Sequence, residues 1–417
     1  MFRSIAVAVA ALYFAPSIFA LHSAFPYGTE KIRGVSLGGW LSIWPFVTPS
    51  LFDAANDSRI IDEFTFSQYQ DRKKVESILK HHWDTWITED DFIAISKAGL
   101  NHVKVPLGTW AFGVNKGEPF VQGQLPYLKK AAHWAQKHGL KLLIDFHGAP
   151  GSQNGFLNSG HFLASPTWHT SKTNIEETST AVKQLAWMFK DMTDTVTIID
   201  PLNETPAFLG PNVTSIIKDF YTDSYGNIRY PYGNSRKSST IVLLHDGFSL
   251  NVWDDFMITP EWEGVMFDTH FYQGFALVDQ QRTYDEHIKW SCNYTNTLKS
   301  SPHRLVVGEW TTAISDCGLY LGGIGMGSKY DGTAANSTQT GSCEGLTGPA
   351  SKFSPSYKAF LRKLWEAQVI AFERGSEGWF QWNWKMEIAQ EWSYKSGLQY
   401  GWIPQHVTDL KYPHICD

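Results

Sequence analysis

Eight short apolar segments, rich in β-branched residues, recur along the chain and constrain its fold more than any other feature. A polar or glycine-rich stretch follows each segment, and many are followed by residues with the apolar spacing of a helix. Short apolar runs of this kind are typical of buried strands. The eight segments are 31–37, 102–107, 141–147, 195–204, 240–246, 265–271, 304–310 and 378–384.

Three segments between these runs carry apolar residues at helical spacing, at 125–139, 178–192 and 356–375. The first ends in Gly139, a residue typical of helix C-termini. Buried strands that alternate with helices predict an α/β fold, a (β/α)8 TIM barrel with long loops at the C-terminal face of the strands.

The main rival is an open doubly wound sheet. That fold usually carries a Gly-rich nucleotide-binding turn after its first strand. Here the first run leads into SLGGWLSIWP at 36–45, which has no GxGxxG pattern. Long connections also follow the first, third, sixth and seventh runs, as expected where barrel loops build a site. The sequence therefore favours the barrel.

The N-terminus has the pattern of a secretory signal peptide. In residues 1–20, Arg3 precedes an apolar run that ends in small residues. Pro16 and Ser17 interrupt the run before it could span a bilayer comfortably, which disfavours a signal anchor. We expect a secreted, extracellular or cell-wall protein with one domain over 21–417 and no later membrane span.

The composition excludes several classes of function. Of the 417 residues, 43% are hydrophobic and 18% are charged, which argues against disorder. A formal net charge of -6 disfavours nucleic acid and anionic membranes as partners. Aromatic residues make up 15% and include 18 Trp. Core packing explains most of them, but aromatic faces also stack on sugars, and composition cannot separate the two roles.

The four cysteines lie in the last third of the chain. In a secreted protein an even number predicts two disulfides, with three possible pairings. CxxC and other metal-ligand spacings are absent from the sequence.

Five segments match the N-x-[ST] glycosylation pattern. Four are predicted glycosylation sites, at Asn56, Asn212, Asn293 and Asn336. The fifth, Asn203, directly precedes Glu204 at the end of a predicted strand. A glycan on Asn203 would block a site at that strand end, so we expect Asn203 to be unmodified.

Polar and aromatic residues gather at the predicted strand ends, where a barrel places its catalytic groups. They are His147, Asn203, Glu204, His270, Tyr272, Glu309, Trp382 and Trp384. Each alone has an ordinary structural explanation, such as a solvated Glu or a hydrogen-bonded core His. Together they suit glycoside hydrolysis, which needs one carboxyl to donate a proton and one carboxylate to attack the anomeric carbon.

The chain closely resembles fungal exo-β-1,3-glucanases of glycoside hydrolase family 5, in clan A of retaining β-glycosidases. The resemblance covers nearly the whole mature chain. Its motifs are RGVSLGGWL (33–41), HWDTWITEDDF (82–92), PLGTWAF (106–112), HGAPGSQNGFLNSG (147–160), HDGF (245–248), VGEW (307–310), KYDGT (329–333) and EWSY (391–394).

The resemblance implies double displacement, with Glu204 as acid/base and Glu309 as nucleophile. It implies that His147, Asn203, His270, Tyr272 and a Trp of the eighth strand bind the sugar, with Trp384 favoured over Trp382. It implies a β-glucan or β-glucoside substrate, a monomer, and no cofactor or metal. It also implies the disulfides Cys292–Cys416 and Cys317–Cys343.

Four positions depart from the family pattern. Trp44 stands where relatives have a Glu that binds the terminal glucose, and Lys104 replaces an Arg that braces the nucleophile. Both are among the predicted substrate-binding residues. The Lys at 104 keeps the positive charge of the Arg but lacks its planar guanidinium, which can donate two parallel hydrogen bonds. Thr109 replaces an aromatic residue and predicts a changed cleft shape, and Thr205 replaces a Pro.

These departures leave the substrate open. The first interpretation is an exo-β-glucanase or β-glucosidase acting from the non-reducing end. The alternative is a rutinosidase-like diglycosidase that removes a 6-O-substituted glucose disaccharide from flavonoid glycosides. A third is a non-catalytic wall protein that binds glucan in its cleft. The presence of both carboxylates disfavours the third.

Overall fold

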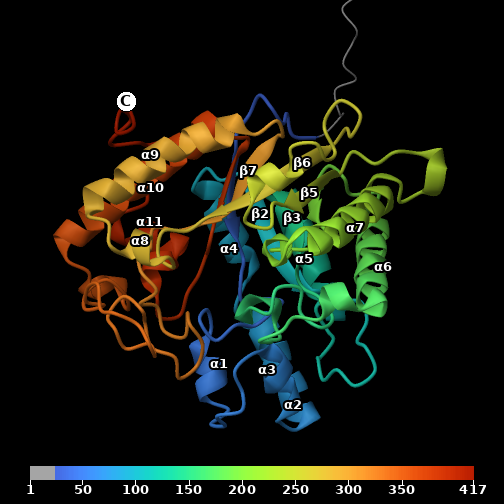
Figure 1. Ribbon diagram of the computed structural model, residues 1–417, viewed down its shortest axis with the longest axis horizontal. Helices are drawn as coiled ribbons and strands as arrows, with labels where there is room; N and C mark the ends of the chain where they lie inside the picture. The colour runs from blue at the N-terminus through green and yellow to red at the C-terminus, as the bar shows by residue number, and fades with distance from the viewer. Residues whose placement is uncertain (1–23) are drawn as a thin grey trace, which may run out of the picture.

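A closed barrel of eight parallel strands forms the centre of the computed structural model, which describes residues 24–417 (Figure 1). The strands follow chain order around the barrel, and β8 closes it by pairing with β1. This confirms the predicted (β/α)8 barrel. The predicted signal peptide, 1–20, lies outside the described residues. The strands are β1 Ile32–Ser36, β2 His102–Gly108, β3 Lys141–Gly148, β4 Val196–Asp200, β5 Ile241–His245, β6 Val265–Phe271, β7 Leu305–Trp310 and β8 Gly378–Gln381.

Two strands end earlier than the sequence analysis predicts. β4 ends at Asp200 because Pro201 follows it and cannot donate to a strand ladder. β8 ends at Gln381, and soon after it the backbone N–H of Asn383 donates to Trp392 instead of a neighbouring strand. Residues 201–204 and 382–384 therefore form turns at the mouth of the barrel.

The predicted helices are present with shifted bounds. The segments expected at 125–139 and 356–375 are α5 and α10, and Gly139 has the left-handed φ of +71° expected at a C-terminus. α6 starts before the expected 178, because the Ser171 side chain caps it by accepting from the N–H of Asn174. The α-helices are α1 Pro49–Asp53, α2 Glu63–Gln68, α3 Arg72–Thr85, α4 Glu89–Lys97, α5 Leu125–Lys137, α6 Lys172–Phe189, α7 Pro211–Arg229, α8 Leu277–Gln280, α9 Tyr284–Ser300, α10 Pro355–Gly375 and α11 Tyr394–Tyr400.

The barrel interior changes from apolar to polar along the strands. An apolar layer fills its N-terminal half and contains Ile32, Leu143, Ile198, Leu243, Met266, Val306 and Phe380. Two residues further along four of these strands, alternation brings polar side chains to the same interior face. With Lys104 of β2 they form what we call the polar layer: Lys104, Asp145, Asp200, His245 and Asp268, all fully buried.

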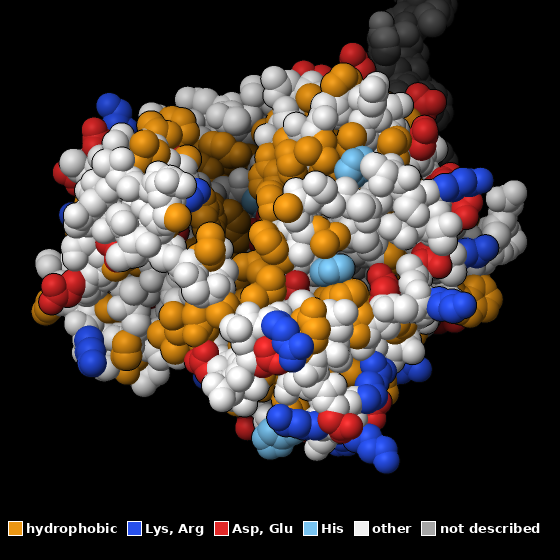
Figure 2. All heavy atoms as spheres, turned by 60° about the horizontal axis from the view of Figure 1, so that its bottom comes forward, with side chains coloured by type: hydrophobic (Ala, Val, Ile, Leu, Met, Phe, Trp, Pro, Cys, Tyr) orange, Lys and Arg blue, Asp and Glu red, His pale blue; other side chains and the backbone are white. Residues whose placement is uncertain are grey.

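Loops at the C-terminal ends of the strands surround the mouth of the barrel. Figure 2 looks onto this face and shows a hollow whose visible lining is largely hydrophobic. The loop after β7 is closed by the disulfide Cys317–Cys343, and Cys292–Cys416 ties α9 to the C-terminal segment. Both bonds have the pairing that the family resemblance implies.

The loop after β7 also reaches the loops of β1 and β3. The Tyr320 hydroxyl donates to Asp53 Oδ1 of α1 at 2.7 Å. A Cβ built on Gly323 would lie 3.7 Å from Leu157 Cδ1, in the loop after β3. Both observations place the loop after β7 beside the loops after β1 and β3. None of the helices in residues 24–417 has the length and apolar character that a bilayer crossing requires.

Candidate active site

The two glutamates predicted at the strand ends meet at the barrel mouth. Glu309 lies on β7, and Glu204 lies in the turn after β4. One carboxylate oxygen from each, together with a ring nitrogen of His270, lie within 4.8 Å of one another. Glu204 has a left-handed backbone with φ of +47°. Such a conformation costs a non-glycine residue about 1 kcal/mol or more and is common at functional sites.

Both oxygens of Glu309 have donors. Lys104 Nζ lies 3.0 Å from Oε1, and the Tyr272 hydroxyl donates to Oε2 at 2.8 Å. Burial, with the nearby charges of Glu309 and Glu204, raises the pKa of Tyr272 well above its ordinary value, so this hydroxyl keeps its proton. A carboxylate with two such donors is stabilised in its ionised form.

Glu204 has a different set of partners. His270 Nδ1 lies 3.0 Å from its Oε1, and the side-chain amides of Asn158 and Asn154 donate to Oε2 at 2.5 and 3.3 Å. Burial favours the neutral acid, but His270 and Asn158 outweigh it and lower the pKa of Glu204. Burial also opposes the imidazolium, yet Glu309 and the other carboxylates raise the pKa of His270 well above its ordinary value. The proton shared by this pair therefore resides on His270.

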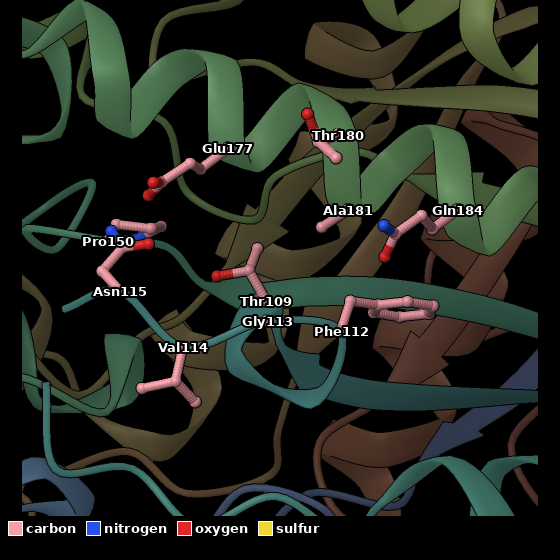
Figure 3. Close-up of a pocket in the computed structure, with 10 residues that line it drawn as sticks. All are labelled: Thr109, Phe112, Gly113, Val114, Asn115, Pro150, Glu177, Thr180, Ala181 and Gln184. Carbon is pink, nitrogen blue, oxygen red and sulfur yellow. The ribbon is translucent and has the colours of Figure 1, made fainter.

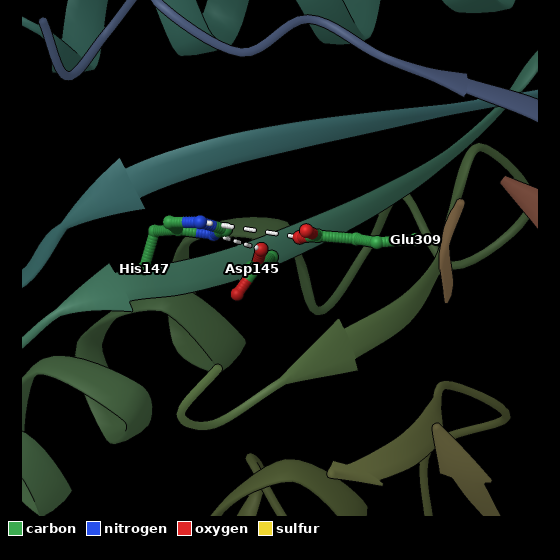
Figure 4. Close-up of side chains that lie close together, drawn as sticks. All are labelled: Asp145, His147 and Glu309. Atoms are coloured by element: carbon green, nitrogen blue, oxygen red, sulfur yellow. Dashed lines mark hydrogen bonds and ion pairs between the residues drawn. The ribbon is translucent and has the colours of Figure 1, made fainter. Parts of the chain in front are cut away.

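An Asp-x-His pattern on two strands orients the histidines. Asp145 Oδ2 accepts from His147 Nδ1 at 2.7 Å, and Asp268 Oδ2 lies 3.3 Å from His270 Nε2. Figure 4 shows the ring of His147 directed toward both Asp145 and Glu309, with His147 Nε2 at 3.9 Å from Glu309 Oε1. The sequence analysis missed both aspartates. The signal was present, because residues two apart on a strand face the same side.

Two groups of side chains have the donor atoms of a metal site: Asp145, His147 and Glu309, and Glu204, His270 and Glu309. In the first group, Lys104 Nζ lies 3.2 Å from Asp145 and 3.0 Å from Glu309, where a metal cation would have to bind. In the second, the protonated His270 lies between the carboxylates. Resident cationic groups thus already balance these carboxylates.

Asn203 and Lys104 also belong to this cluster. Asn203 is fully buried, its Oδ1 lies 3.4 Å from Lys104 Nζ, and its Nδ2 lies 3.4 Å from His147 Nε2. Thr205, the third residue of the sequon, is fully buried and bonds the Tyr221 hydroxyl at 2.9 Å. In contrast, the side chains at the other four sequons are exposed: Asn56, Asn212, Asn293 and Asn336.

The structure corrects the choice between the two tryptophans after β8. Trp382 stacks on His147 with ring centroids 5.4 Å apart, beside the predicted site residues. Trp384, the predicted residue, is fully buried, donates its Nε1–H to Asp91 and stacks on Tyr394. Its side chain points away from the cluster because alternation stops where β8 ends at Gln381.

Trp44 is likewise fully buried and does not line the hollow as expected. Its ring packs behind His147 and Trp382, with centroids 4.9 and 5.4 Å away. The predicted effect of Thr109 on the cleft stays a prediction. Figure 3 shows Thr109 at a separate pocket of about 240 Å³ between the loop after β2 and α6, which Glu177 also lines.

Three exposed phenylalanines, which the sequence analysis did not single out, form a wall beside Glu204. Phe156 and Phe208 stack with centroids 6.0 Å apart, and Phe248 lies 6.2 Å from Phe208. Each ring is more than two-fifths exposed. Phe156 lies between Asn154 and Asn158 in the sequence, so this phenylalanine wall adjoins the carboxyl of Glu204.

Comparison with known proteins agrees with this architecture. A family model described as Cellulase (glycosyl hydrolase family 5) matches residues 69–319. Glucan 1,3-beta-glucosidase of Blumeria graminis is 40% identical over 417 residues, covering 99% of this chain and 95% of the relative. Probable glucan 1,3-beta-glucosidase A of Emericella nidulans is 40% identical over 406 residues, covering 97% of each.

Among solved structures, the rutinosidase from Aspergillus niger superimposes with a TM-score of 0.71 at 17% identity, covering 91% of this chain and 99% of that chain. This likeness concerns the fold alone. The family match and the full-length relatives show that the chain belongs to glycosyl hydrolase family 5 and is a glycoside hydrolase.

Proposed function

We propose that the protein is a retaining exo-β-1,3-glucanase or β-glucosidase that cleaves β-glucosidic bonds from the non-reducing end. One observation carries the retaining mechanism: carboxylate oxygens of Glu204 and Glu309 lie within 4.8 Å of each other. Retaining glycosidases place their carboxyls about 5–5.5 Å apart, whereas inverting enzymes leave roughly 6.5–9.5 Å for a water.

The different partners of the two glutamates support separate roles. Glu309, ionised beside Lys104, attacks the anomeric carbon and forms a covalent glycosyl-enzyme ester. Glu204 gives a proton to the glycosidic oxygen as that bond breaks, and later takes one from the water that hydrolyses the ester. At rest this proton is on His270, whose Nδ1 lies 3.0 Å from Glu204 Oε1. It reaches Glu204 by transfer along this hydrogen bond before Glu204 donates it to the leaving oxygen.

The sugar at the cleavage point would lie among Tyr272, Trp382 and Asn203, which surround the carboxylates. Action at a chain end is supported by the loop after β7, whose Tyr320 donates to Asp53 of α1 and whose Gly323 lies near Leu157 of the loop after β3, on one side of the mouth. A β-1,3-glucan as substrate is supported by the names of relatives that match over nearly their full length.

A second candidate is a rutinosidase-like diglycosidase acting on flavonoid glycosides. It is favoured by the phenylalanine wall, whose exposed rings suit a flat aromatic leaving group beside Glu204. Trp44 adds to it, because the acceptor that relatives use for the terminal glucose is absent.

A substrate panel tests these proposals: laminarin, p-nitrophenyl β-glucoside and rutin, with Glu204→Gln and Glu309→Gln as inactive variants. Exposed Glu344→Gln serves as a matched control with full activity. Release of glucose from laminarin supports the glucanase. Release of intact rutinose, with little action on laminarin, selects the second candidate. Turnover that survives both glutamine variants would contradict the site itself.

We further propose secretion after removal of residues 1–20, a single catalytic domain over 21–417, and glycans on the exposed sequons. The disulfide that joins Cys416 to α9 supports one domain that extends to the C-terminus. N-terminal sequencing and glycopeptide mapping of the secreted protein test these points. A mature start far inside the barrel, or a glycan on Asn203 of active protein, would contradict them.

A further inference from the structure

Asp200 is a buried carboxyl of the polar layer to which the catalytic scheme gives no role. It ends β4 and is fully buried below Glu204. Its Oδ1 accepts one hydrogen bond, from the N–H of Leu202 at 3.0 Å. Its Oδ2 is buried and has no hydrogen-bond partner among residues 24–417.

The other two aspartates of the polar layer have cationic partners. Asp145 lies 3.2 Å from Lys104 Nζ and 2.7 Å from His147 Nδ1. Asp268 lies 3.3 Å from His270 and also accepts from the N–H of Gly308 at 2.7 Å. Asp200 makes no ion pair with any residue that the structure describes. A buried charge without a counter-ion is strongly unfavourable, and such a group remains neutral instead.

A neutral Asp200 would have a proton to donate, and an acceptor lies beside it. Asp145 and Asp200 are register partners on the adjacent strands β3 and β4, so their side chains face the same interior. Asp145 Oδ1 is buried and, within the described chain, also lacks a partner. One O–H···O bond would satisfy both unpaired oxygens.

We propose that Asp200 is a positioning residue that holds a proton at neutral pH and donates it to Asp145, leaving Lys104 to stabilise the ionised Glu309. The bond draws negative charge of Asp145 away from Lys104, whose Nζ lies closer to Glu309 than to Asp145, at 3.0 against 3.2 Å. The catalytic part of this inference rests on the proposed role of Glu309.

The surrounding charges are consistent with a neutral Asp200. Burial and the carboxylate of Asp145 raise its pKa well above the ordinary value, with Asp268 adding to the effect and Lys104 opposing it. On the adjacent strand β5, burial lowers the pKa of His245 well below its ordinary value, and its Nδ1 accepts from the N–H of Gly247. This neutral ring adds no positive charge.

Tyr221 of α7, which packs against the end of β5, adds no positive charge near Asp200 either. Burial raises the pKa of Tyr221 well above its ordinary value, and its hydroxyl donates to the carbonyl of His245. Lys104 is therefore the cation that faces Asp200, and it already lies near Asp145, Glu309 and Asp268.

Infrared spectroscopy of the intact protein tests the proton directly and needs no activity. Aspartate labelled with ¹³C separates its C=O band from that of buried glutamic acids. We expect a band of protonated aspartic acid at pH 7.5 in the wild type, absent from Asp200→Asn. The exposed Asp255→Asn is the control and should keep the band. Absence of the band from the wild type, or its survival in Asp200→Asn, would overturn the proposal.

The pH–rate profile tests the positioning role. Asp200→Leu removes the donor and should lower kcat more than about tenfold. The isosteric Asp200→Asn keeps an N–H donor and should retain most of the wild-type kcat. Its acidic limb should move by less than about 0.3 pH units. A limb displaced by a unit or more in Asp200→Asn would mean that a negative charge had been removed, which contradicts a neutral Asp200. A wild type inactive on the substrate panel contradicts the proposed function, but leaves the infrared result valid.

Discussion

Replacing Lys104 with Met removes the one ammonium at the centre of the site and keeps an unbranched side chain of similar length. Lys104 Nζ lies 3.0 Å from Glu309, 3.2 Å from Asp145 and 3.9 Å from Asp268, and all four side chains are buried. At an effective dielectric constant near 20, each of the two shorter contacts corresponds to about 5 kcal/mol of Coulomb attraction. Desolvation of the ammonium offsets much of this sum.

Removal of one partner from a buried ion pair typically costs about 3–5 kcal/mol, and we expect a loss of that size in the free energy of unfolding at pH 7. The pH dependence of this loss in stability is determined by Asp145. Burial opposes its ionisation, but Lys104 and His147 hold its pKa below the ordinary value. The stability from this pairing is therefore present above about pH 4 and lost as the pH falls further, so the deficit of the variant should shrink as the pH falls below about 4.

Urea unfolding followed by tryptophan fluorescence, at pH 7 and near pH 3, measures this loss. In parallel, kcat should fall in Lys104→Met, because Glu309 Oε1 loses its charged donor at 3.0 Å. Lys104→Arg keeps the charge and should be less affected than Lys104→Met. The exposed Lys73→Met is the matched control. A Met variant as stable as the wild type at pH 7, with an unchanged kcat, would refute Lys104 as the counter-ion of the site.

Three further predictions concern stability and sugar binding. Burial raises the pKa of Glu63 to about 8, so this group makes the folded state less stable as pH rises from about 4.5 to 8, by up to about 1.4 kcal/mol per pH unit. Glu63→Gln should flatten that slope in urea unfolding at several pH values, and an unchanged slope would contradict the neutral carboxyl. The disulfide Cys292–Cys416 spans 124 residues, so the double Ala variant should lose about 2–5 kcal/mol and a corresponding part of its Tm, whereas an unchanged Tm would show that the bond is dispensable. Trp382→Ala should lower kcat/KM by roughly tenfold or more, since it removes the ring that stacks on His147. Trp384→Phe should mainly lower the free energy of unfolding. Equal losses of kcat/KM in the two variants would contradict the placement of these side chains.

The order of elements could be predicted from the sequence because local pattern determines it. Each expected run overlaps an observed strand, with β2 and β3 extending one residue further, and α5 and α10 match their predicted segments closely. Where the chain leaves the sheet could not be seen from pattern alone. Pro201 marked the end of β4, but the end of β8 depends on a tertiary bond from Asn383 to Trp392. The sequence pattern therefore could not separate Trp382 from Trp384.

The catalytic side chains could be predicted from the sequence, but the buried side chains that support them could not. Glu204, Glu309 and the two histidines were recognisable as polar residues at the ends of apolar runs. Asp145 and Asp268 lie within such runs, and their roles become visible only once the barrel closes and brings Lys104 from β2 between them. Likewise, the burial of Trp44 depends on rings supplied by β3 and by the turn after β8.

The central claim is that Glu309 forms a covalent intermediate. A 2-deoxy-2-fluoro-β-glucoside with a good leaving group slows hydrolysis of that intermediate, because the fluorine disfavours its oxocarbenium-like transition state. Peptide mass spectrometry of the treated protein should then find one fluoroglucosyl group, on the peptide that contains Glu309, and none in Glu309→Gln. A label on Glu204 or another residue, or inactivation without a covalent label, would contradict the account.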